Sequence, residues 1–248
     1  MKTGAGIAAS AWRLFALLLL SALALQLFFV ARVALMRVVD PQSTTFERSE
    51  IARLASAKPG FAWRQRWLAY ERVAAPLKRA VVAAEDAGFN AHGGVEWDSI
   101  ERAWQRQQRR AEWRPAGRTR AARAMPKLVG GSTITQQLAK NLLLSGERNF
   151  VRKGQELVIA MLLEALLDKR RILELYLNHV EWGEGVFGAE AAARHHFRIG
   201  AGALGPAQAA QLAVMLPAPK RFEKRPGSAY VVGRAGTVSA RMGAVELP

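Results

Sequence analysis

The 248-residue sequence contains no cysteine. Disulfide bonds, cysteine-ligated zinc and thiol catalysis are therefore excluded, because each requires a cysteine sulfur. The sequence also has few stretches in which apolar and polar residues alternate, the pattern that is typical of half-buried strands. A mainly α-helical fold is expected, with short helices packed around one core.

Acidic residues are outnumbered: 36 Lys and Arg stand against 20 Asp and Glu, which gives a formal net charge of +16. Such an excess attracts polyanions, among them nucleic acid, anionic lipid headgroups and pyrophosphates. Half of the residues are hydrophobic (50%), which argues against wholesale disorder. The length suits one membrane anchor and one globular domain.

Residues 14–31 form an almost uninterrupted apolar run near the N-terminus. A membrane-spanning helix needs about 20 apolar residues, whereas the apolar region of a cleaved signal peptide has about 7–15. Phe28-Phe29-Val30 also lacks the small residues of a cleavage site. We therefore expect an uncleaved anchor over residues 13–37, behind a short cytoplasmic tail of residues 1–12.

Basic residues flank this anchor almost equally, with Lys2 and Arg13 before it and Arg32 and Arg37 after it. The positive-inside rule therefore does not decide the orientation. A short tail before a large domain is the usual layout of a signal anchor. We expect a single-pass protein of the cytoplasmic (inner) membrane with its bulk on the periplasmic face.

Behind the anchor, residues 38–58 are expected to be a stalk, because the stretch around Pro41 breaks a helix. A globular domain is expected over residues 59–248. Residues 61–70 interleave aromatic residues and arginines, which fits either the membrane interface or an amphipathic helix. Residues 106–127 are rich in arginine and interrupted by proline and glycine, which predicts a long loop.

Apolar periodicity predicts several helices in the domain. Thr133 and Gln136 have the spacing of a capping box, which marks a helix start. The helices are expected over residues 74–87, 133–144, 150–167, 168–178, 188–197 and 206–215, with a weaker one over 228–242.

Three short elements contain candidate functional residues. Glu85 and Asp86 end a predicted helix, where the helix dipole disfavours carboxylates, so they belong either to a site or to a solvated helix end. Arg148, Arg152, Lys153 and Glu156 form the second element. The last three residues have the spacing of one helical face, and the alternative is a surface salt bridge of about 0.2–1 kcal/mol.

The third element is the stretch around Gly130-Gly131, at a helix start. Glycines there leave backbone N–H groups open to an anion, and this predicts a pyrophosphate cradle. The glycine spacing differs from that of a Walker loop, and a capped helix that uses its polar residues locally is the alternative. The side chains that would line the cradle are Ser132, Thr133, Gln136, Gln137 and Lys140.

In their order along the chain, these elements resemble the peptidoglycan glycosyltransferases of glycosyltransferase family 51, and closely the monofunctional biosynthetic transglycosylases. The resemblance extends from about residue 70 to residue 242. It rests on Glu85-Asp86-x-x-Phe89-x-x-His92-x-Gly94-x-Glu96, on 131–141, on Arg152-Lys153-x-x-Glu156, on Ile172-Leu173-Glu174-x-Tyr176-Leu177-Asn178, and on Leu216-Pro217-Ala218-Pro219.

The resemblance implies a lysozyme-like, bilobal, mainly α domain that polymerises glycan strands from lipid II. The C4 hydroxyl of the acceptor GlcNAc would attack C1 of the donor MurNAc, undecaprenyl pyrophosphate would leave, and the configuration would invert to β-1,4. Lipid II, the growing strand, membrane lipids and other cell-wall synthesis and division proteins are the expected partners. Nucleic acid is not expected.

Residue roles also follow from the resemblance. Glu85 would be the general base. Glu156 would be the second essential carboxylate, acting through a divalent cation (Mg²⁺ or Mn²⁺) or by orienting basic groups; no organic cofactor is expected. Lys140, Arg148, Arg152 and Lys153 would bind the donor pyrophosphate, completed by Ser132, Thr133, Gln136 and Gln137. Asp86, Phe89, His92 and Asn178 would lie in the site or support it structurally.

Two other functions remain open at this point. A lytic glycosidase on the same fold would need a general acid and a positioned water, and its leaving group would be a neutral sugar. A membrane-tethered polyanion-binding protein, for example one that binds nucleic acid, would account for the positive charge without any catalysis.

Overall fold

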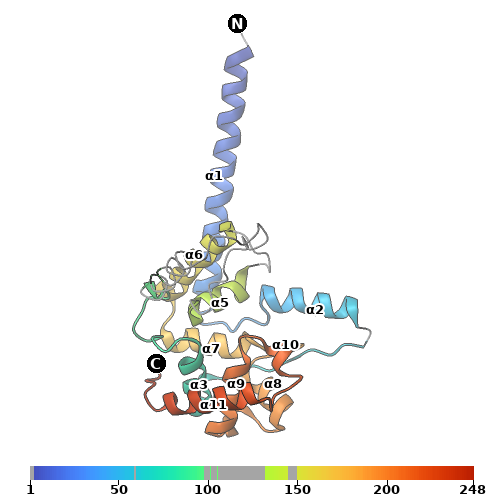
Figure 1. The fold of residues 1–248 in the computed structure, drawn as a ribbon. Helices are drawn as coiled ribbons and strands as arrows, with labels where there is room; N and C mark the ends of the chain where they lie inside the picture. The colour runs from blue at the N-terminus through green and yellow to red at the C-terminus, as the bar shows by residue number, and fades with distance from the viewer. Residues whose placement is uncertain (1–2, 59, 98–100, 102–104, 106–131, 145–149) are drawn as a thin grey trace, which may run out of the picture. The chain divides into compact units, whose positions relative to one another are not determined.

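The computed structural model describes residues 3–58, 60–97, 101, 105, 132–144 and 150–248 (Figure 1). It divides into two compact units, Met1–Pro41 and Gln42–Pro248. Helix α1 (Thr3–Leu35) makes up most of the first unit. Its part Ala9–Leu35 has 27 residues and contains an 18-residue window with a mean hydropathy of 2.5. At about 1.5 Å per residue this part is longer than the hydrocarbon core of a bilayer, about 30 Å, so it can span a membrane as the sequence predicted.

The second unit differs from the expected stalk, because residues Thr45–Ala57 form helix α2. Thr44 and Glu47 make a complete capping box at its start, and Leu54 is fully buried. The helix packs against α5 (Ile134–Leu143), so most of the expected stalk belongs to the globular domain. Pro41 lies three residues before the cap and therefore does not interfere with the helix that follows.

Short helices dominate the rest of the unit, and the mainly α class is confirmed. The predicted helices agree with the observed ones to within one or two residues at most ends. They are α3 (Ala75–Glu85), α5, α6 (Phe150–Leu166), α7 (Lys169–His179), α8 (Ala189–Phe197), α9 (Pro206–Met215) and α11 (Ala229–Met242). The short helix α10 (Pro219–Phe222) and the 3₁₀ turns η1 (Tyr70–Arg72) and η3 (Ala201–Ala203) were not predicted.

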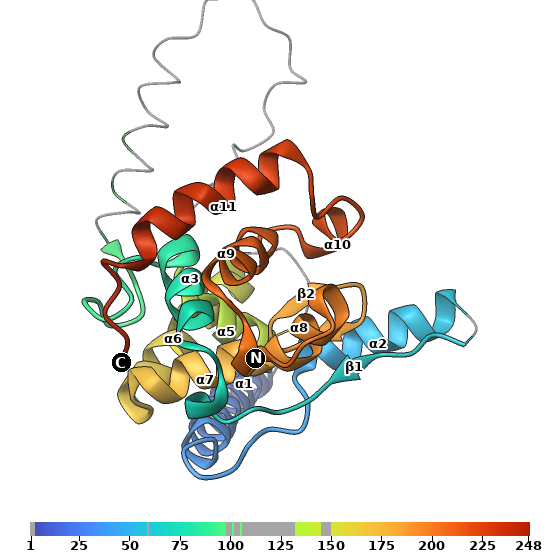
Figure 2. The same cartoon turned by 90° about the horizontal axis from the view of Figure 1, so that it is seen from below.

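The helices form two packed groups that share the core. Helices α3, α9 and α11 lie against one another, and α5 contacts α2, α6 and α7 (Figures 1 and 2). Leu77 of α3, Leu138 of α5 and Leu163 of α6 are almost completely buried. Burying such a side chain stabilises the fold by about 1.5–3 kcal/mol. This packing fixes the end of α3 and the start of α5, where the candidate site lies.

Residues 61–69 do not form the amphipathic helix that was one of the two interpretations of this segment. They are extended, and β1 (Arg64–Gln65) pairs in parallel with β3 (Val186–Phe187), which pairs antiparallel with β2 (Glu181–Gly183). Asn178 holds the segment by accepting a bond from Leu68 N (2.8 Å) and donating one to Leu68 O (3.0 Å). The helical interpretation fails because these bonds come from residues more than 100 positions away.

Glu181 of β2 is buried next to a second carboxylate, Glu50 of α2. Lys220 Nζ lies 3.4 Å from Glu181 Oε1 and also pairs with Glu50. Burial raises the pKa of Glu181 to about 7; Lys220 opposes the shift, while Glu50 and Glu223 add to it. The folded protein therefore binds this proton more tightly than the unfolded chain does.

We expect the free energy of unfolding to fall as pH rises from about 5 to above 7, because Glu181 must then ionise in a buried site. The contribution is at most about 3 kcal/mol, fully present below the unfolded pKa and lost through the folded one. Glu181→Gln should flatten this slope in denaturant titrations of the full chain in detergent. Glu184→Gln, at a neighbouring half-buried carboxylate whose pKa is lowered chiefly by its bond from Lys58, should keep it. An unchanged slope in Glu181→Gln would contradict the assignment.

Candidate active site

Glu85 is the last residue of α3, and its side chain is half-buried at the start of α5. Gln137 Nε2 donates a hydrogen bond of 2.8 Å to Glu85 Oε2. Among the residues that the structure describes, none hydrogen-bonds the other oxygen, Oε1. The carboxylate is therefore held on one side and retains an oxygen that can accept a proton.

Tyr176 of α7 orients the amide of Gln137. Its hydroxyl donates to Gln137 Oε1 at 3.0 Å, so the amide turns its NH₂ group toward Glu85. Burial, followed by the charges of Glu85 and Asp86, raises the pKa of Tyr176 well above its usual value. The phenol therefore keeps its proton and remains a donor. The chain of hydrogen bonds from Tyr176 through Gln137 to Glu85 links three helices, and this role of Tyr176 was not predicted from the sequence.

The pKa of Glu85 is raised, chiefly by burial. The bond from Gln137 lowers it and the neighbouring charge of Asp86 raises it. Desolvation disfavours the ionised form of a carboxylate, and a hydrogen bond to that form favours it. A carboxylate with a raised pKa is a stronger base, which suits proton abstraction from a hydroxyl group.

Asp86 has a structural role that explains the carboxylate at the end of α3. Its Oδ2 accepts the backbone N–H of Ile134 at 3.0 Å, and its Oδ1 accepts His92 Nε2 at 2.8 Å. Ile134 is the first residue of α5. A helix N-terminus favours a negative charge, so Asp86 is unfavourable for its own helix but favourable for α5. It joins the two elements and thereby brings Gln137 to Glu85.

The loop after Asp86 is fixed to the same helix start. The backbone N–H of Gly94 donates to His92 Nδ1 at 3.1 Å, so His92 carries its proton on Nε2 and donates it to Asp86. Thr133 Oγ1 donates to Gly94 O at 2.6 Å. Phe89 is fully buried, with Lys169 Nζ 4.5 Å from its ring centre. His92 and Phe89 therefore have structural roles: they help to hold the loop that follows Asp86.

The predicted capping box at the start of α5 is confirmed. Thr133 Oγ1 accepts Gln136 N, Gln136 Oε1 accepts Thr133 N, and both side chains are buried. Their polar atoms are thus used at the helix start, whereas Ser132 and Gln137 are accessible. Asn178 is bound to Leu68 and the backbone of Glu174 and acts in the fold.

The candidate cations lie on α5 and α6. Lys140 is exposed one turn after Gln137, a spacing that places both on one side of α5. On α6, which packs against α5, Arg152 Nη1 pairs with Glu156 Oε2 at 2.9 Å and Lys153 Nζ pairs with Glu156 Oε1. Glu156 is buried and holds both cations in place. Arg148 and residues 106–127 lie outside the described residues.

A divalent cation was the one cofactor that the resemblance implied. In the part of the chain that the structure describes, no three His, Asp or Glu side chains come together as metal ligands. Both oxygens of Glu156 are occupied by Arg152 and Lys153. These residues therefore do not fit a protein-held metal site, and the divalent cation stays a prediction.

Comparison with known proteins bears on the function of these residues. The transglycosylase family model matches residues 52–243. The chain belongs to the transglycosylase family. It is 48% identical over 244 residues to a biosynthetic peptidoglycan transglycosylase of Burkholderia pseudomallei (98% of this chain, 86% of the relative). The proteins of the same description from Bordetella pertussis (50% over 223 residues, 90% and 88%) and Paraburkholderia phytofirmans (48% over 227 residues, 91% and 88%) are similar.

Membership of this family identifies the chain as a glycosyltransferase of peptidoglycan synthesis. The resemblance in sequence is thereby confirmed. Family membership favours peptidoglycan synthesis over the two alternatives, a lytic glycosidase and a purely polyanion-binding protein. The apolar helix α1 is compatible with membrane anchoring of such an enzyme.

Proposed function

We propose that this transglycosylase polymerises glycan strands from lipid II, with Glu85 as the general base. The acceptor C4 hydroxyl loses its proton to Glu85 while its oxygen bonds to C1 of the donor MurNAc. The bond from C1 to undecaprenyl pyrophosphate breaks, and the configuration inverts. The observation that supports this role most is the half-buried Glu85 carboxylate, fixed through one oxygen by Gln137.

The departing pyrophosphate gains negative charge, and fixed cations that offset this charge lower the barrier. Lys140, Arg152 and Lys153 would serve this purpose, joined by Arg148. Glu156 acts on the reaction through its neighbours, because its two ion pairs orient Arg152 and Lys153. No step of this mechanism passes through a metal ion.

The lipid-linked donor requires a membrane location, which supports the proposal that α1 anchors the enzyme in the inner membrane with the catalytic domain on the periplasmic face. Membrane lipids and the growing strand are then its immediate surroundings, and other cell-wall synthesis and division proteins are further proposed partners.

Labelled lipid II tests the proposal directly. We expect the purified full chain in detergent to make products longer than lipid II, with and without Mg²⁺ or Mn²⁺ as separate arms. Lys140→Ala should raise the KM for the donor about 10-fold, because an ionic contact with a phosphate is lost. Lys224→Ala, which removes an exposed lysine after α10, is the matched control. Failure to elongate lipid II, or shortening of finished strands, would contradict the function.

Gln137→Met should move the acidic limb of the pH dependence of kcat/KM to higher pH. The amide bond favours ionised Glu85, so its loss raises the pKa of Glu85 further and leaves less base at a given pH. Tyr176→Phe keeps the amide and should shift the limb less. The limb is measured by initial polymerisation rates between pH 5 and 9. If the acidic limb of Gln137→Met lies at the same pH as in the wild type or at a lower one, the proposed effect of Gln137 on the pKa of Glu85 is refuted.

A further inference from the structure

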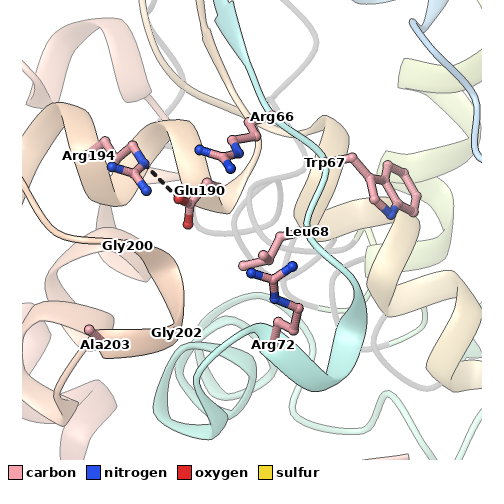
Figure 3. A pocket seen from close by; sticks show the side chains of 9 residues that line it. All are labelled: Arg66, Trp67, Leu68, Arg72, Glu190, Arg194, Gly200, Gly202 and Ala203. Atoms are coloured by element: carbon pink, nitrogen blue, oxygen red, sulfur yellow. Dashed lines mark hydrogen bonds and ion pairs between the residues drawn. The ribbon is translucent and has the colours of Figure 1, made fainter.

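A hollow of about 440 Å³ is lined by residues that take no part in the mechanism above. One wall is the segment 66–72, which leads into η1, and the other is formed by α8 and η3 (Figure 3). Arg66 and Arg72 come from the first wall, and Arg194 and Glu190 come from α8. In Figure 3 the three arginine side chains extend toward the same space, whereas Trp67 is turned away from it.

Arg66, Arg72, Arg194 and Glu190 together are called the arginine pocket. Hydrogen bonds hold Glu190 in place within it. Its side chain is buried, Oε1 accepts Arg194 Nε at 2.7 Å, and Oε2 accepts the backbone N–H of Ala201 at 2.7 Å. Burial opposes ionisation, but these two bonds and the charge of Arg66 bring the pKa of Glu190 below its usual value. Glu190 therefore stays ionised and balances one of the three guanidinium groups.

The other two positive charges are not balanced inside the pocket. Neither Arg66 nor Arg72 has an ion-pair partner among the residues that the structure describes, and both side chains are accessible. Like charges on converging side chains repel one another, at an energetic cost that an anion between them would remove. The pocket thus has two cationic groups available for a ligand.

The backbone leaves room for a ligand between these walls. Gly200 and Gly202 line the pocket without side chains. A Cβ atom at Gly202 would lie 2.7 Å from Arg72 O, so only glycine allows η3 to approach the Arg72 segment this closely. The two walls therefore lie close together. The volume of the pocket lies in the range of small-molecule sites, about 300–1,000 Å³.

We propose that the arginine pocket binds a carboxylate group of a small ligand. The planar guanidinium matches a carboxylate in a two-point contact, and two unbalanced guanidiniums suit a ligand with one or two such groups. With Glu190 ionised, the three guanidinium groups and the one carboxylate leave the pocket a net charge of +2, which suits a ligand of charge −1 or −2. One source is the free C-terminal carboxylate of a peptide, as in the peptide stems of peptidoglycan, and this source rests on the proposed function. The other is a free dicarboxylate.

Calorimetric titration of the full chain in detergent tests the proposal without lipid II, so its outcome is independent of polymerisation. The probes are N-acetyl-D-alanyl-D-alanine for the peptide source, succinate for the free dicarboxylate, and inorganic phosphate for comparison. We expect at least one carboxylate probe to bind more tightly than phosphate, and the tighter of the two identifies the source.

The variant Arg66→Gln/Arg72→Gln should weaken this binding about 10-fold or more, because two charge-assisted contacts are lost. Arg79→Gln, at an exposed arginine of α3 that does not line the pocket, should bind as the wild type does. Arg66→Lys/Arg72→Lys keeps the charge without the planar group and should still bind several-fold more weakly. Equal binding of phosphate, no binding of either carboxylate, or unchanged binding in the glutamine variant would overturn the proposal.

Discussion

Replacing Glu85 by glutamine should lower the rate of glycan polymerisation about 100- to 10,000-fold, the range that a positioned general base contributes. Glutamine has nearly the same shape, so the environment of Gln137 and α3 is retained while the proton acceptor is lost. The affinity for lipid II should change little, because the donor pyrophosphate is assigned to the cations of α5 and α6. The effect should therefore appear in kcat and leave KM nearly unchanged.

Initial rates with labelled lipid II and a separate binding titration distinguish these two quantities. Glu71→Gln is the matched control, because Glu71 is an exposed carboxylate of η1 outside the site. It should keep wild-type rates. If Glu85→Gln retains more than about a tenth of the wild-type kcat, Glu85 is not the base. If binding of lipid II is lost as well, Glu85 contributes to donor binding. The assignment of donor binding to the cations of α5 and α6 alone would then be wrong.

Much of the fold could be predicted from the sequence, because the signals concerned are local. Apolar periodicity located α3, α6 and α9, and the spacing of Thr133 and Gln136 located the start of α5. Thr44 and Glu47 have the spacing of the same local signal, which could have located the start of α2. Residues 61–69 could not be predicted in this way, since their conformation depends on bonds to β3 and Asn178.

In the candidate site, too, local patterns could be predicted from the sequence, whereas long-range contacts could not. Glu85, Gln137 and Lys140 could be proposed from motifs, but the hydrogen bond between Gln137 and Glu85 depends on tertiary structure. Tyr176 could not be given its role from the sequence, because a tyrosine in a buried helix is typical of a core. The only signal was its place in the fourth motif of the family resemblance, which does not reveal its bond to Gln137. The arginine pocket was missed entirely, since its residues come from two distant segments.

Replacing Asp86 by asparagine should destabilise the fold, because both carboxylate oxygens accept hydrogen bonds. Its two oxygens accept bonds from two groups that can only donate: the backbone N–H of Ile134, and His92 Nε2, whose proton is fixed there because Nδ1 accepts Gly94 N–H. An asparagine has one acceptor oxygen and one NH₂ group. Asp86→Asn must therefore direct a donor at a donor, and we expect the free energy of unfolding to fall by about 1–3 kcal/mol.

Asp168→Asn is the matched control, because Asp168 caps α7 by accepting Arg171 N, and asparagine caps a helix as well as aspartate does. It should change the free energy of unfolding by less than about 0.5 kcal/mol. Denaturant titrations of both variants in detergent give the comparison. Equal stability of Asp86→Asn and the wild type would mean that the His92–Asp86–Ile134 connection does not hold α3 to α5. In that case the Gln137–Glu85 hydrogen bond and the packing of the surrounding core would be enough to hold the end of α3 against the first turn of α5.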